Sequence, residues 1–268
     1  MPSLPLEVIG EIIDSLQDDL PALRSCSQTC LSLLPLCRKH IFRTISLAPQ
    51  DRLRLSGCIT LLGNLLDSNP GVADYVRNLI YYINTPDFED EAVPRTLRKF
   101  HRIQYFRLTG HVDSANWHNF QPAFQQSLSY IISLPSITSL EICSFRVFPI
   151  NIFIPCINLT ELILDEIIES AVMDNSEYEN SASYAVPQLQ SFTSGTKGGY
   201  LKDLVEARRS KDVPVLDFSN LRKLGFDLDE HSHLAAVYEL TKVAEKLETL
   251  CYSGLYQTYL RLYAGTKC

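Results

Sequence analysis

The chain has 268 residues, of which 46% are hydrophobic and 21% are charged. This balance is typical of folded globular proteins and excludes an intrinsically disordered chain. A net charge of -7 at pH 7 excludes the broad positive surface that binds phosphate backbones, so we expect protein partners and no nucleic acid. Leucine is the commonest residue, with 39 copies, which favours a fold whose core is built mainly from leucine.

The N-terminus does not resemble a secretory signal, because it has no basic start and carries Glu7 inside what would be its apolar stretch. The longest apolar region, residues 147–157, contains Pro149 and Pro155 and is about half as long as a membrane span. Eight cysteines lack CxxC pairs and regular spacing, which favours reduced thiols. We therefore expect a cytoplasmic or nuclear protein with no membrane partner.

Residues 1–48 have apolar positions at helical spacing, which predicts three short helices. The stripes are Val8, Ile9, Ile12, Ile13 and Leu16; then Leu20, Leu23, Cys26, Cys30 and Leu33; and then Cys37, Ile41, Phe42 and Ile45. Pro5 stands where a first helical turn tolerates proline, and Asp18 and Asp19 precede Pro21 as a helix start. Three short helices bury little area, so we expect this head to lean on another surface.

Cys26, Cys30, Cys37 and His40 form the cluster of this head that offers zinc ligands. Their spacing, C-x3-C-x6-C-x2-H, matches no zinc module that we know, and thiols pack readily as small hydrophobic groups. We therefore expect buried core positions and no metal, with metal binding as the lesser alternative.

The head also carries a longer pattern of residues in fixed order. It consists of Leu4-Pro5-x-Glu7-Val8-Ile9-x-x-Ile12-Ile13-x-x-Leu16, Asp19, Ala22-Leu23-Arg24-x-Cys26-Ser27, Cys30, Leu34-Pro35 and Arg38-x-His40-Ile41-Phe42-Arg43-x-Ile45. In order and spacing this pattern resembles the F-box, in the form common in fungal, especially mushroom-type, proteins. Leu33 stands where the family usually has Trp, and it can still fill an apolar position.

F-box domains bind the Skp-type adaptor subunit of cullin-RING ubiquitin ligases. The resemblance implies an adaptor-binding set, which comprises adaptor-facing side chains and their supporting core: Leu4, Pro5, Val8, Ile9, Ile12, Leu16, Leu20 and Leu23. The alternative is that the same stripe packs only inside the protein.

Residues 49–268 repeat a short unit of the form apolar-x-x-apolar-x-apolar or aromatic. It recurs as Val76/Leu79/Tyr81, Ile103/Phe106/Leu108, Ile137/Leu140/Ile142, Leu159/Leu162/Leu164, Leu189/Phe192, Leu221/Leu224/Phe226 and Leu247/Leu250/Tyr252. Apolar positions of period two predict a strand in each unit, and stripes at helical spacing predict helices over residues 55–66, 124–132 and 234–244.

These units look like irregular leucine-rich repeats. We therefore expect an α/β fold, with an all-α head on residues 1–48 and a solenoid on residues 49–268. Parallel strands would line the concave side of the solenoid, with helices outside.

The residues between the inward positions of such a solenoid form an exposed concave surface. In this chain they are Tyr105, Arg107, Ser139, Glu141, Glu161, Ile163, Asp165, Lys223, Asp227 and Thr249. The resemblance makes this the target-recruiting surface, with Tyr105, Arg107, Glu141, Glu161, Asp165, Lys223 and Asp227 as candidate target-binding residues. The alternative is that most of them are ordinary solvated strand residues.

Three stretches break the regularity. Residues 85–94 and 173–184 are acidic or polar, and we expect solvated loops, with selection of a basic partner as the lesser alternative. Residues 194–199 are rich in glycine but lack the Lys-Ser or Lys-Thr pair of a phosphate loop, which indicates a mobile loop. No polar capping unit follows Tyr252, which predicts a truncated or marginally stable C-terminal end.

The sequence contains no nucleophile–base, metal or cofactor motif, so we expect neither catalytic residues nor cofactors. The resemblance implies a substrate-recruiting subunit of a Skp-cullin-F-box type ubiquitin ligase. Its partners would be the Skp-type adaptor, through it a cullin, and an unknown target protein. One alternative is a non-ligase interaction scaffold whose head only caps the repeats; the other is an enzyme, which a cleft with strongly shifted pKa values would reveal.

Overall fold

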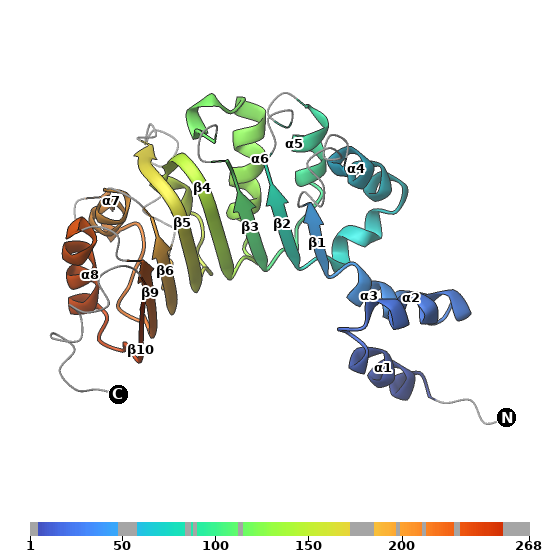
Figure 1. Ribbon diagram of the computed structural model, residues 1–268. Helices are drawn as coiled ribbons and strands as arrows, with labels where there is room; N and C mark the ends of the chain where they lie inside the picture. Colours follow the sequence, from blue (N-terminus) through green and yellow to red (C-terminus); the bar gives the residue numbers. More distant parts are fainter. Residues whose placement is uncertain are drawn as a thin grey trace.

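The computed structural model describes residues 5–47, 58–83, 87, 90–111, 115–171, 185–196, 199–210, 213–227 and 231–253. They form an arch with one parallel sheet along its inner side, helices along its outer side and three further helices beyond one end (Figure 1). The protein is therefore α/β, as the sequence predicts. None of the helices in these residues is both long enough and apolar enough to cross a bilayer.

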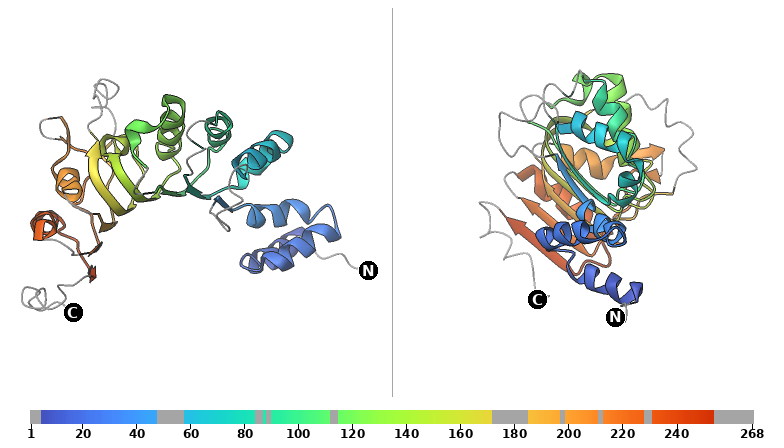
Figure 2. Two further views of the ribbon diagram at one scale, coloured as in Figure 1. Left: turned by 45° about the horizontal axis from the view of Figure 1, so that its top comes forward. Right: turned by 90° about the vertical axis from the view of Figure 1, so that its right-hand side faces the viewer.

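The three helices at the N-terminal end, which we call the head, are α1 (Leu6–Ser15), α2 (Leu20–Thr29) and α3 (Leu34–Ile41). Asp19 caps α2, because its carboxylate accepts a hydrogen bond from Ala22 N at 3.0 Å. Their small core contains Ile13, Leu23 and Cys37, against which lie the partly buried Ile9, Leu16, Cys26, Leu33, Leu36 and Ile41. Figure 2 shows these helices gathered at one end of the arch.

A strand, β1 (Thr44–Leu47), follows the head and corrects the helical stripe predicted through Ile45. Its residues alternate between exposed and partly buried positions, and Ile45 pairs with Leu79 of β2 (Asn78–Tyr82). Ile45 and Leu47 pack against the large core of the body. Four residues are too few for periodicity alone to separate a strand from a helical turn.

The main sheet has the order β1-β2-β3-β4-β5-β6-β9-β10, and each neighbouring pair is parallel. Its further members are β3 (Tyr105–Thr109), β4 (Ser139–Pro149), β5 (Glu161–Ala171), β6 (Ser191–Gly195), β9 (Lys223–Asp227) and β10 (Thr249–Ser253). All seven repeated units of the sequence contain a strand of this sheet. Parallel neighbours require a crossover, and most of the connections between them contain an α-helix.

Helices cover the outer side of the sheet (Figure 1). They are α4 (Cys58–Ser68), α5 (Ala92–Leu97), α6 (Pro122–Ile132), α7 (Tyr200–Glu206) and α8 (His231–Val243), with the 3-10 turns η1 (Pro70–Tyr75), η3 (Trp117–Asn119) and η4 (Ile150–Phe153). The predicted stripes correspond to α4, α6 and α8. A small antiparallel pair, β7 (Arg208–Ser210) and β8 (Val213–Pro214), has no counterpart in the sequence prediction.

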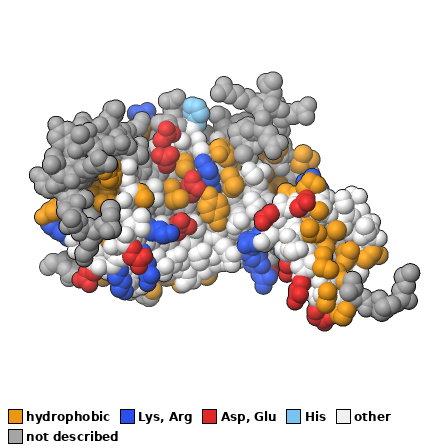
Figure 3. Space-filling view, turned by 60° about the horizontal axis from the view of Figure 1, so that its bottom comes forward, with side chains coloured by type: hydrophobic (Ala, Val, Ile, Leu, Met, Phe, Trp, Pro, Cys, Tyr) orange, Lys and Arg blue, Asp and Glu red, His pale blue; other side chains and the backbone are white. Residues whose placement is uncertain are grey.

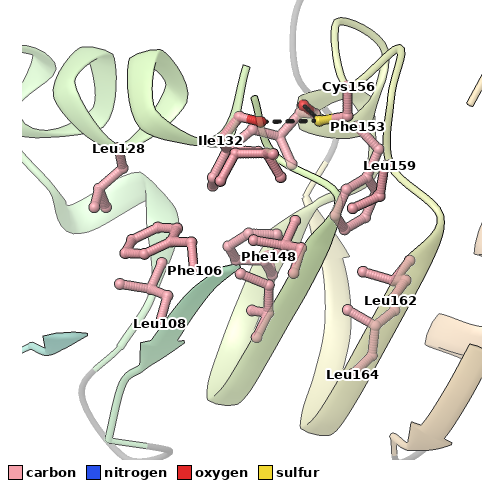
Figure 4. Packing of buried hydrophobic residues seen from close by; sticks show 14 of the residues in the cluster. Phe106, Leu108, Leu128, Ile132, Phe148, Phe153, Cys156, Leu159, Leu162 and Leu164 are labelled. Carbon is pink, nitrogen blue, oxygen red and sulfur yellow. Dashed lines mark hydrogen bonds between the residues drawn. The ribbon is translucent and has the colours of Figure 1, made fainter. Parts of the chain in front are cut away.

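The core lies between the sheet and these helices. Phe106, Leu140, Leu162, Phe192 and Leu224 stack in register across five strands, and each is at most 1% exposed. Figure 4 shows part of this core, including Phe106 and Leu162, with the Cys156 thiol donating to Ile132 O at 3.3 Å. Burial raises the pKa of Cys156 to about 12, so this thiol stays neutral.

Two of the predicted loops differ from expectation. Asp87 is buried and accepts a hydrogen bond from the Tyr81 hydroxyl at 2.9 Å, and residues 92–94 begin α5, so residues 85–94 are not simply a solvated loop. In the glycine-rich stretch, Ser194 and Gly195 belong to β6 and Thr196 is buried. The predicted loop at 173–184 and the C-terminal end beyond Ser253 lie outside the described residues.

Candidate functional surfaces

The head carries large apolar side chains that its own core does not cover. Leu6, Val8, Ile12, Leu20 and Leu31 are 57%, 39%, 49%, 41% and 86% exposed. Val8 and Ile12 lie one helical turn apart on the same side of α1. We use the name apolar face of the head for Leu6, Val8, Ile12 and Leu20, the four of these residues that belong to α1 and α2. Figure 3 shows hydrophobic side chains gathered on the head with acidic side chains at their border. An exposed apolar group with a polar border is typical of a protein contact surface.

The predicted adaptor-binding residues divide between this face and the interior. Pro5, Val8, Ile12 and Leu20 are exposed, whereas Ile9 and Leu16 are half-buried and Leu23 is fully buried. Leu23 can therefore act only as supporting core. Leu4 lies outside the described residues.

An ion cluster fixes α1 against α3. The Asp14 carboxylate lies 2.5 Å from Lys39 Nζ and 2.7 Å from His40 Nε2. Hydrogen bonds first from Lys39 and then from His40 lower the pKa of Asp14.

The cysteines of the head do not all lie in its core. Cys37 is buried and Cys26 is half-buried, but Cys30 is exposed, which corrects the expectation of a core position for it. The Cys30 thiol lies 2.8 Å from Ser32 Oγ, and this hydrogen bond lowers its pKa. Within the described ranges, no group of three or more His, Cys, Asp or Glu residues is arranged to hold a metal ion.

The second surface is the inner face of the main sheet, which is the face opposite the helices. Strand alternation places six predicted target-binding residues there: Tyr105, Arg107, Glu141, Glu161, Asp165 and Lys223. Lys223 and Asp165 are exposed, and the other four are half-buried. The side chain of Asp227, the seventh residue, lies outside the described part of the structure.

Three of these residues meet in one cluster across β3 and β4. Tyr105 Oη donates to Glu141 Oε2 at 2.5 Å, and Arg107 Nε lies 3.4 Å from Glu141 Oε1. The Arg107 guanidinium also lies 5.9 Å from the centre of the Tyr82 ring. Burial and then the bond to Glu141 raise the pKa of Tyr105, so its hydroxyl stays protonated and continues to donate.

The other predicted residues do not join this cluster. Glu161 accepts a hydrogen bond from Ser139 Oγ at 2.8 Å, which links β5 to β4 one row away. Asp165 instead lines a hollow of about 420 Å³ on the inner face, together with Glu141 and Ile163. Glu141 therefore belongs to both the cluster and the hollow, whereas Glu161 and Lys223 belong to neither.

The floor of the hollow depends on residues that the sequence analysis did not assign to a binding surface. Thr193 and Cys251 have small side chains, and Gly195 and Gly225 have none. A Cβ on Gly195 would collide with the Asp165 carboxylate, and a Cβ on Gly225 would lie 3.1 Å from Thr193 Oγ1. Glycine inside a strand was the available signal, because it often marks a close approach.

Comparison with the models of known protein families finds no match, and comparison with curated proteins finds no similar sequence. The apolar face of the head and the inner face of the sheet are therefore the observations on which a function can be argued.

Proposed function

We propose that this protein is the substrate-recruiting subunit of a Skp-cullin-F-box type ubiquitin ligase. The head, acting as an F-box, binds the Skp-type adaptor and through it the cullin. The body, as a leucine-rich-repeat solenoid, binds a target protein on the inner face of its sheet. The observation that carries the proposal is the apolar face of the head, formed by Leu6, Val8, Ile12 and Leu20.

The energetics of this face support an adaptor contact. Burying a Val, Leu or Ile side chain completely stabilises a complex by roughly 1.5–3 kcal/mol relative to leaving it exposed. The four side chains are 39–57% exposed, so burying the exposed part of each against a partner would give about half of that stabilisation. Ile13 and Leu23 already fill the core of the head, so the exposed residues are not needed to complete it.

The proposed role requires no bond chemistry from this chain. A target held on the inner face keeps its lysines close to a thioester that another subunit carries, which raises their effective concentration there. The contribution of this chain is therefore proximity. The arch places the head at one end and the inner face along its length, so the two partners bind separate surfaces (Figure 2).

The experiment is co-purification of the full chain with a purified Skp-type adaptor. A Val8→Asp, Ile12→Asp double variant places two charges on the apolar face and is expected to lose the adaptor while keeping its circular dichroism. Leu61→Asp is the matched control, because Leu61 is 69% exposed but lies on α4 of the body. Failure of the folded wild-type chain to bind would reject the ligase role.

One observation favours a second candidate, a non-ligase interaction scaffold whose head is a cap. β1 pairs with β2, and Phe42, Ile45 and Leu47 pack against the core of the body, so the chain passes from the head straight into the sheet. A cap needs no exposed apolar face. The scaffold predicts that the double variant changes no partner interaction, whereas the ligase subunit predicts loss of the adaptor.

A further inference from the structure

Two cysteines of the head stand opposite each other on α2 and α3. Residues 30–33 connect these helices, which pack side by side as a helical hairpin. Facing positions of such a hairpin lie equally far from its connection. Cys26 lies four residues before the connection begins, and Cys37 lies four residues after it ends. The two side chains therefore meet between the helices.

The packing of the head agrees with this placement. Cys37 is fully buried in the small core of the head, and the half-buried Cys26 packs against that core. Burial, and then the thiols of Cys26 and Cys30, raise the pKa of Cys37, and the effect of Cys26 is the larger of the two. The Cys26 thiol is therefore the nearer neighbour of Cys37.

Cys30 is the accessible thiol of the hairpin. It is exposed at the start of the connection, and Leu31 beside it is 86% exposed, so the connection is open to solvent. Its Sγ lies 2.8 Å from Ser32 Oγ, and this hydrogen bond lowers its pKa. The thiolate is the form of cysteine that attacks a disulfide. Cys30 also follows Cys26 by one helical turn, so it lies beside the facing pair.

We propose that Cys26 and Cys37 form a reversible disulfide that links α2 to α3, and that Cys30 is the thiol through which a small disulfide oxidant reacts. The inference goes beyond the proposed function, because it needs neither the adaptor nor a target protein.

The proposed exchange proceeds in three attacks on sulfur. The Cys30 thiolate attacks the oxidant, which forms a mixed disulfide and releases one small thiolate. Cys26 then attacks the Cys30 sulfur and releases the second small thiolate. Cys37 attacks the Cys26 sulfur, which forms the final bond and returns the Cys30 thiolate. The protons of Cys26 and Cys37 pass to the two released thiolates, so the oxidant is reduced to two thiols as the cysteine pair is oxidised.

The expected consequence is a head that opens less often. Three short helices around a small core have little packing to hold them together. A disulfide between residues 26 and 37 restricts the unfolded hairpin and so favours the folded one. Oxidation should therefore slow amide hydrogen exchange in α2 and α3 by at least about tenfold. Exchange in α6 of the body should stay the same.

The test treats the folded full chain with oxidised glutathione, blocks the remaining thiols with N-ethylmaleimide and maps a chymotryptic digest by mass spectrometry. Cleavage after Leu31 or Leu33 separates Cys26 from Cys37 unless a disulfide joins them. We expect the two peptides to stay linked, with Cys30 outside the linkage, and to separate after treatment with dithiothreitol. Hydrogen exchange of the reduced and oxidised chains gives the second readout.

Three variants assign the roles. Cys30→Ser should still form the linkage, but at a rate lower by at least about fivefold, since the accessible thiolate is gone. Cys26→Ala should form no linkage with Cys37 and show no slowing of exchange. Cys251→Ser is the matched control, because Cys251 is another exposed cysteine but lies on β10 of the body. Its linkage should form at the wild-type rate.

A wild-type digest without the linkage, or with Cys30 joined to Cys37, would overturn the pairing, and this result does not depend on the folding of any variant. Equal rates for Cys30→Ser and Cys251→Ser would overturn the role of Cys30. Unchanged exchange in α2 and α3 after oxidation would overturn the effect on the head. Failure of the chain to bind the adaptor would reject the ligase role and leave all these results as they are.

Discussion

Ser144 and Glu166 lie opposite each other in β4 and β5, and both have left-handed backbone, with φ of 59° and 50°. Ser144 Oγ donates to the Glu166 carboxylate at 2.7 Å. Both strands continue beyond this pair, to Pro149 and Ala171. The hydrogen bond thus joins two residues whose left-handed backbone is unfavourable for most residues that carry a Cβ.

This pair predicts an unusual order of stability for variants of Ser144. Ser144→Ala loses the hydrogen bond and keeps the left-handed strain, so the free energy of unfolding should fall by about 1 kcal/mol. Ser144→Gly loses the same bond but relieves strain of about 1 kcal/mol, so it should lie close to wild type. Urea unfolding measures both; an alanine variant as stable as the glycine variant would contradict the account.

Neighbouring residues of α1 should behave differently, because Ile13 is 3% exposed and Ile12 is 49% exposed. Ile13→Ala should lower the free energy of unfolding by about 2–3 kcal/mol, since it opens a cavity in a small core. Ile12→Ala should lower it by less than about 1 kcal/mol. Chemical denaturation of the two variants gives the comparison, and similar losses would show that Ile12 is also a core residue.

Gly195 should be coupled to Asp165. A Cβ at position 195 collides with the Asp165 carboxylate, so Gly195→Ala should cost about 1 kcal/mol of stability as the carboxylate turns away. In an Asp165→Ala background the same substitution should cost much less. A double-mutant cycle of unfolding free energies measures this coupling; additive effects would mean that the two residues do not interact.

Asp14 should contribute a pH-dependent part of the stability. Its pKa in the folded protein is lowered by Lys39 and His40, so its contribution is complete above the unfolded value near 3.8 and is lost as the pH falls through the lower folded value. The stability difference between wild type and Asp14→Asn should therefore shrink below about pH 4. Glu11→Gln, on the same helix, is the control; a constant difference down to pH 2 would contradict the contact.

Thiol reactivity should separate the exposed and buried cysteines. Burial raises the pKa of Cys143 and of Cys156 to about 12, whereas the hydrogen bond between Cys30 and Ser32 lowers the pKa of the exposed Cys30. Because the thiolate is the reactive form, iodoacetamide at pH 8 should label Cys30 first and leave Cys143 and Cys156 unmodified. Peptide mapping by mass spectrometry checks this; early labelling of Cys156 would show that its layer opens.

Seven of the eight strands of the main sheet were predictable because the repeated units, except that of Leu189 and Phe192, place two apolar residues at period two, as with Leu162 and Leu164. That alternation also assigned Tyr105, Arg107 and Glu141 to one face. The parallel register then brought Tyr105 and Glu141 together, which spacing along the chain does not encode.

The rest depends on contacts between distant residues. Asp87 is buried because the Tyr81 hydroxyl bonds to it, and an isolated acidic loop carries no sign of that partner. The hollow exists because Gly195 and Gly225 lack side chains on adjacent rows, which becomes visible only when the strands are aligned. Likewise, helical periodicity marks both Ile12 and Leu23 as apolar, but only packing decides that Ile12 faces outward and Leu23 inward.

The most direct test of the central claim is a calorimetric titration of the full chain with a purified Skp-type adaptor, comparing wild type, Ile12→Asp and Leu61→Asp. The proposed function predicts saturable binding that Ile12→Asp weakens by at least about tenfold, since a charge on the contact face remains partly desolvated, and that Leu61→Asp leaves unchanged. Absence of binding by the folded wild-type chain, or equal affinities for all three chains, would contradict it.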